Sequence, residues 1–112
     1  MARRRPRRRV RTKTVRILGQ DWLLTPVASK NKAYENCCGM CELRGAIIRI
    51  NPHTSAACQG DTYLHELIHA LSFRLNLGLD ERKTYAFAAS LLTALRDNRD
   101  LTMRVLNGKP IV

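Results

Sequence analysis

The segment from Tyr63 to Gly78 carries the pattern that most restricts the fold of this chain. Its apolar residues recur at steps of three and four, which is the spacing of an amphipathic helix. They are Leu64, Leu67, Ile68, Leu71 and Leu75. Thr54 or Ser55 suits the N-cap, and Gly78 suits the position after the last turn. The pattern therefore predicts a long helix that buries one face against the rest of the protein.

The same predicted helix contains an HExxH motif, His65-Glu66-Leu67-Ile68-His69. Histidines four residues apart lie on one face of a helix, where both imidazoles can bind one Zn²⁺. Glu66 would then lie beside the open coordination position and act as a general base toward a water whose pKa the metal lowers. The alternative is that His65 and His69 are ordinary residues of a polar helix face. The glutamate between them favours the metal site.

A zinc site with two histidines needs a third protein ligand, and Glu81, Asp80 and His53 are the candidates. A second helix is predicted from Asp80-Glu81 to about Asp97, with acidic residues at its start. A tight turn at Gly78 would fold this start back alongside the first helix. Glu81 is the predicted ligand, whereas Asp80 is better explained as the N-cap and His53 as a loop residue.

Two short apolar segments precede the helices. The first flanks Gly19-Gln20-Asp21 and suggests a hairpin, and the second runs from Met40 to Ile50 around Arg44-Gly45, where the glycine can supply the positive φ of a tight turn. Residues 99–112 are predicted to be a tail with a short strand at Met103 to Leu106. The expected fold is α+β, with a small, mostly antiparallel sheet packed on two helices in a domain of residues 14–98.

The first sixteen residues hold nine of the 20 Lys and Arg residues and no acid, so most of the +11 formal charge lies there. Residues 1–13 are predicted to be a disordered basic arm. The segment Arg3 to Arg16 could neutralise several phosphates, which would give nucleic-acid binding without sequence specificity. No apolar run approaches the ~20 residues that span a bilayer, and no signal-peptide pattern follows the arginines. The expected location is cytoplasmic, without membrane association.

Four cysteines allow three interpretations. Cys38 and Cys41 have the spacing of a thiolate zinc site, but Cys37 and Cys58 do not supply a second Cys-x-x-Cys pair. Without a signal peptide, disulfides are the least favoured. Thiols that pack as small hydrophobic side chains are the favoured interpretation.

Residues 39–98, about half of the chain, resemble a group of short zincin-like proteins common in phages and prophages. The matching segments are GMCELRGAIIRI (Gly39 to Ile50), YLHELIHALSFRLNLGL (Tyr63 to Leu79) and DERKTYAFAASLLTALRDN (Asp80 to Asn98). The layout is more distantly similar to the core of the SprT-like and ImmA/IrrE-like metallopeptidases. The resemblance implies a minimal zincin-like core, zinc bound by His65, His69 and Glu81, and Glu66 as the general base.

The leading functional hypothesis is a zinc-dependent hydrolase, specifically a metallopeptidase acting on a protein or peptide. The strand Ala46 to Ile50 would be an edge strand that aligns an extended substrate by β-augmentation. The alternative is a non-catalytic, nucleic-acid-associated phage protein with a zincin scaffold and the arginine-rich arm as its binding element. A third class is a partner-binding protein without metal.

Overall fold

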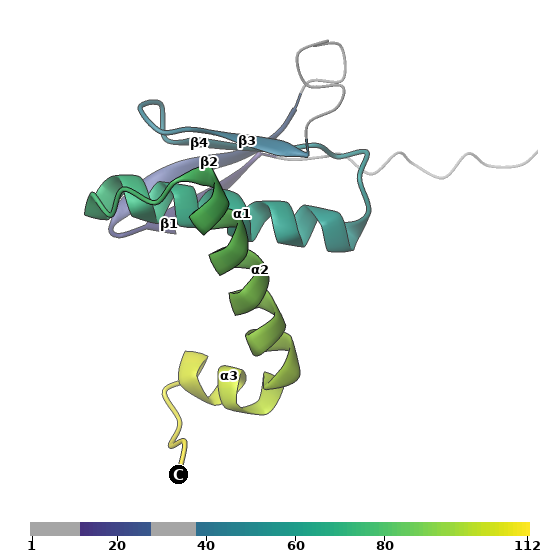
Figure 1. The fold of residues 1–112 in the computed structure, drawn as a ribbon, viewed down its shortest axis with the longest axis vertical. Coiled ribbons are helices and arrows are strands. Elements are labelled where there is room, and N and C mark those ends of the chain that lie inside the picture. Colours follow the sequence, from purple (N-terminus) through teal and green to yellow (C-terminus); the bar gives the residue numbers. More distant parts are fainter. Residues whose placement is uncertain (1–11, 28–37) are drawn as a thin grey trace, which may run out of the picture.

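The computed structural model describes residues 12–27 and 38–112 (Figure 1). Residues 1–11 of the predicted basic arm lie outside the described residues, and so does Cys37. The described residues form four strands and three helices. These are β1 (Lys13–Ile17), β2 (Gln20–Pro26), β3 (Gly39–Glu42), β4 (Ile47–Ile50), α1 (Ala56–Leu75), α2 (Glu81–Asp97) and α3 (Arg99–Leu106). The predicted α+β class is confirmed.

The strands form one sheet in the order β1-β2-β4-β3. The pairs β1/β2 and β3/β4 are antiparallel, whereas β2 and β4 are parallel. The parallel pair is joined by hydrogen bonds of 2.9 Å from Leu23 N to Ala46 O and from Val27 N to Ile50 O. The prediction that residues 46–50 form an edge strand is therefore wrong. In the second hairpin it is the second strand, β4, that pairs with β2. The first strand, β3, therefore lies at an edge of the sheet formed by the described residues.

Both hairpins turn through residues with positive φ. Leu18 (φ 48°) and Gly19 (φ 78°) connect β1 to β2, and two successive positive φ values are what a type I′ turn requires. In the second hairpin the positive φ of 53° belongs to Ala46 and not to Gly45. The expectation for Gly45 is wrong because this connection is longer than two residues, and the left-handed position falls where the chain re-enters β4.

Helix α1 lies across one face of the sheet and contacts β3 and β4 (Figure 1). The core between them is formed by buried residues of β1, β2, β4 and α1. These are Ile17, Trp22, Ile48 and Ala70, all at most 2% exposed. Ile48 faces α1, whereas Arg49 on the opposite face pairs with Glu42 at 3.3 Å. This alternation matches the predicted pattern of β4, and it determines which face of the sheet α1 covers.

Helix α2 packs on α1 and then runs away from the sheet (Figure 1). Its buried residues, Thr84 and Ala88, lie in its first half. The predicted strand at Met103 to Leu106 is wrong, because these residues belong to α3. A strand needs a neighbour to pair with, and α3 lies at the far end of α2 from the sheet. None of the helices in the described ranges has the length and apolar character needed to cross a membrane.

Candidate metal centre

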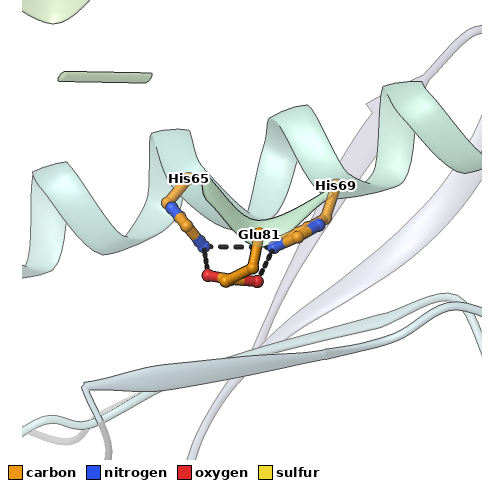
Figure 2. A group of neighbouring side chains, drawn as sticks. All are labelled: His65, His69 and Glu81. Carbon is orange, nitrogen blue, oxygen red and sulfur yellow. Dashed lines mark hydrogen bonds and ion pairs between the residues drawn. The ribbon is translucent and has the colours of Figure 1, made fainter. Parts of the chain in front are cut away.

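Helices α1 and α2 bring His65, His69 and Glu81 together. Figure 2 shows both imidazoles pointing from the same side of α1 toward the Glu81 carboxylate, which bridges them. The two Nε2 atoms are 3.1 Å apart. Glu81 Oε1 lies 2.7 Å from His65 Nε2, and Oε2 lies 2.8 Å from His69 Nε2. The histidine side chains are mostly buried, whereas that of Glu81 is 73% exposed, so the carboxylate covers the imidazoles from the solvent side.

The convergence follows from the i, i+4 spacing on α1 and from a short connection to α2. Ser55 caps the start of α1, where its side chain accepts a hydrogen bond of 3.1 Å from Cys58 N. At the other end Asn76 takes a left-handed conformation (φ 53°), so Asn76 and not Gly78 ends the helix. Gly78 also has a positive φ, of 64°. These two reversals place residue 81 back against the middle of α1.

Asp80 and His53 lie outside this group of ligands. The Asp80 side chain accepts a hydrogen bond of 2.7 Å from Lys83 N, which is the N-cap interaction predicted for it. His53 is exposed in the loop before α1, where its backbone N–H donates a hydrogen bond to Asn51 Oδ1 at 2.9 Å. Of the three candidates for the third ligand, Glu81 is thus the one placed beside the histidines.

The donor set fits zinc. All three ligand atoms lie within 4.8 Å of one another. A tetrahedral site with bonds of about 2.1 Å separates neighbouring donors by roughly 3.4 Å. The observed separations of 3.1, 2.7 and 2.8 Å are all shorter than this, by less than about 1 Å. Two imidazoles and one carboxylate are also a ligand set typical of catalytic zinc sites. Among residues 12–27 and 38–112 this is the one group of at least three such donors, and no cysteine belongs to it.

Glu66 is only 8% exposed and lies next to the donor group. Burial raises the pKa of its carboxyl, the neighbouring His69 and His65 oppose this rise, and Glu81 adds to it. Glu66 also acts on β3, because its charge is the second cause, after burial, that raises the pKa of Cys41 to about 12. Glu66 therefore lies near both His65 and β3, and it lines the same cleft as His65 and Gly39.

A cleft of about 560 Å³ opens beside these residues. Its walls are α1 and α2, and Cys38 and Gly39 at the start of β3 also line it. Tyr85, one turn after Glu81, is 69% exposed and packs its ring edge-on against His65, with 6.2 Å between ring centres. Tyr85 was not predicted as a site residue, although its i+4 position from Glu81 places it on the same helix face.

Comparison with known proteins adds no relative. No protein-family model matches the sequence, and no curated protein or solved structure matches it either.

Proposed function

We propose that this protein is a zinc-dependent metallopeptidase with a minimal zincin-like core. The observation that carries the proposal is the convergence of His65, His69 and Glu81 on one point, with the buried Glu66 beside it. A carboxylate and two imidazoles that already face one another need little rearrangement to hold a divalent cation. The grouping agrees with the ligand set that the resemblance to zincins implies.

Zinc at this site would supply Lewis-acid polarisation of a carbonyl and would lower the pKa of water toward neutrality. Glu66 would be the general base, and this role is supported by its place in the lining of the cleft beside His65 and Glu81. Its carboxylate would take the proton of the attacking water and deliver it to the leaving amine. Burial favours this role, because a carboxylate with a raised pKa is a stronger base than a solvated one.

The substrate would be an extended segment of a protein. The start of β3 lines the cleft, and β3 is an edge strand of the sheet that the described residues form. An edge strand presents unpaired backbone groups, with which an extended peptide can form a further strand. A peptide paired with β3 would pass close to Glu66, because Gly39 of β3 and Glu66 line the same cleft. This assigns to β3 the role that the sequence suggested for residues 46–50.

Elemental analysis of the purified chain tests the metal, and Glu66→Gln tests the chemistry. We expect about one zinc per wild-type chain and its loss in His69→Ala. Glu66→Gln should retain zinc and lose activity toward an unfolded protein such as casein by roughly 10²- to 10⁴-fold. Wild-type protein with well under half an equivalent of zinc would refute the metal site. Equal activity in wild type and Glu66→Gln would refute the assigned mechanism.

The alternative hypothesis, a non-catalytic nucleic-acid-associated protein, is separated by the same variant. A scaffold that binds nucleic acid through Arg3 to Arg16 would bind zinc, show no proteolysis and be unaffected by Glu66→Gln. Its affinity for duplex DNA would fall steeply with salt, since each neutralised phosphate releases counterions.

A further inference from the structure

The thiols of Cys38 and Cys58 are neighbours at the start of β3 and of α1. Cys58 Sγ donates a hydrogen bond to Cys38 Sγ, with 3.8 Å between the sulfur atoms. Cys58 is the third residue of α1, and Cys38 directly precedes β3. Both line the cleft of the metal centre. Cys58 precedes His65 by seven residues, about 10 Å along a helix, so the thiol pair is separate from the candidate zinc ligands.

The backbone on both sides of this pair is anchored. The Cys38 carbonyl accepts a hydrogen bond of 2.8 Å from Asn51 N, and Cys58 N donates to Ser55 Oγ at 3.1 Å. One residue further along β3, a Cβ on Gly39 would lie 2.5 Å from Thr62 Cγ2, so β3 and α1 approach closely here. The proximity of the two thiols thus follows from the packing of β3 on α1 and not from side-chain rotation alone.

We propose that Cys38 and Cys58 are a redox-sensitive pair that forms a reversible disulfide by exchange with a low-molecular-weight disulfide such as glutathione disulfide. The sulfur atoms must approach from 3.8 Å to about 2.05 Å. Cys41 is partly buried and packs against the core beneath β3.

The reaction balances in two exchange steps. The exposed Cys38 loses its proton and attacks one sulfur of the small disulfide, which forms a mixed disulfide and releases the first small thiolate. Cys58 then loses its proton and attacks the Cys38 sulfur, which breaks the mixed disulfide and releases the second thiolate. The two protons end on the two released thiols. The protein pair is oxidised by two electrons, and the small disulfide is reduced by two.

The new bond would join the start of the edge strand to the first turn of α1 at the mouth of the cleft. It would close a loop that contains β3 and β4, and such a covalent loop restricts the unfolded chain. The oxidised protein should therefore melt at a higher temperature than the reduced protein. Because the pair lies apart from His65, His69 and Glu81, the proposal does not depend on zinc.

The test treats the full-length, metal-free protein with glutathione disulfide, followed by non-reducing peptide mapping by mass spectrometry. We expect a monomer that has lost two hydrogen atoms, with one crosslinked peptide pair that contains Cys38 and Cys58 and disappears with dithiothreitol. Cys38→Ser and Cys58→Ser should each abolish it. Cys37→Ser and Cys41→Ser are matched controls that should retain it, and circular dichroism would verify that each variant is folded.

A crosslink that uses Cys37 or Cys41 instead, or links that form only between chains, would overturn the proposal. Crosslinking at the same rate in urea would overturn it as well, because folding would then contribute nothing to the pairing. Repeating the experiment with one equivalent of zinc gives a further criterion. If zinc blocks the crosslink, the thiols are metal ligands and the redox assignment is wrong.

Discussion

The hydroxyl oxygen of Ser72 accepts a hydrogen bond from the backbone N–H of Leu79, with 3.1 Å between the two atoms. Ser72 belongs to the last turn of α1, and Leu79 stands two residues before Glu81. Leu77 N also donates to the Ser72 carbonyl, at 2.9 Å. Both polar groups of one buried residue thus hold the connection that delivers Glu81 to the histidines.

Ser72→Ala should weaken zinc binding although Ser72 is not a ligand. The loss of its hydrogen bond costs about 1 kcal/mol of folding stability and loosens the position of Glu81. We expect zinc affinity to fall by roughly 10-fold, as for the loss of an outer-shell partner. Chelator competition measures this. Ser90→Ala on the exposed face of α2 is the matched control and should leave the affinity unchanged. Equal affinities for both variants would show that the turn holds Glu81 without Ser72.

The parts of the site that were predictable from the sequence are those decided within one or two helical turns. The spacing of His65 and His69 and the N-cap role of Asp80 depend on neighbours a few residues away. The position of Glu81 was predictable because the connection between the helices is short and keeps the start of α2 close to α1. Neither Tyr85 nor Ser72 was found, since their roles depend on how α2 lies on α1.

The parts that were not predictable depend on contacts between distant segments. Both strands of the second hairpin have apolar residues, so the local pattern does not tell which of them joins β2. The parallel pairing of β2 with β4 decides this, so the edge strand is β3 and not β4 as predicted. Met103 to Leu106 fits a strand or a helix locally, and the absence of any described strand beside it leaves the helix.

Gly39→Ala should destabilise the protein, because β3 passes very close to α1 at this point. The added Cβ would lie 2.5 Å from Thr62 Cγ2 and 2.6 Å from the Arg49 carbonyl oxygen. The carbonyl is backbone and cannot rotate away, so the strand must shift. Overpacking of this kind costs about 1–3 kcal/mol, which urea denaturation would measure.

Gly60→Ala is the matched control for Gly39→Ala. Gly60 lies inside α1, and a Cβ there meets no atom within 4 Å. Alanine is the better helix former by about 1 kcal/mol, so this variant should be more stable than the wild type. If Gly39→Ala is as stable as the wild type, β3 does not pack on α1 as closely as the distances from Gly39 to Thr62 and Arg49 indicate.

Glu81→Ala should mainly weaken zinc binding, whereas Asp80→Ala should mainly lower the stability of the fold. Glu81 places both carboxylate oxygens against the imidazoles, so its loss should weaken zinc binding by at least about 10-fold. Asp80→Ala removes a helix cap and should cost about 1 kcal/mol of stability with little effect on zinc. A chelator titration and a thermal melt on each variant separate the two effects. A larger loss of zinc affinity in Asp80→Ala would transfer the ligand role to Asp80, and no loss in either would point to His53.

Cys41 should be almost unreactive in the folded protein. Burial, followed by the charges of Glu66 and Glu42, raises the pKa of its thiol from 9.0 to about 12. Thiolate is the reactive form, so at pH 8 iodoacetamide should modify Cys41 at least about a hundredfold more slowly in the native state than in urea. Since the folded pKa lies above the unfolded one, the unfolded thiol ionises first, and this group lowers the free energy of unfolding as pH rises from about 9 to about 12.

The same measurement tests the position of Glu66. Its charge is the second cause of the raised pKa of Cys41, so Glu66→Gln should lower that pKa and speed up alkylation of native Cys41. Burial, the larger cause, persists in the variant, and the reaction should therefore stay slower than in urea. Glu42→Gln removes the third cause and should have a smaller effect. An unchanged rate in Glu66→Gln, together with a raised rate in Glu42→Gln, would show that the Glu66 carboxylate does not lie near Cys41. The proposal that Glu66 acts as a base beside the edge strand would then lose its support.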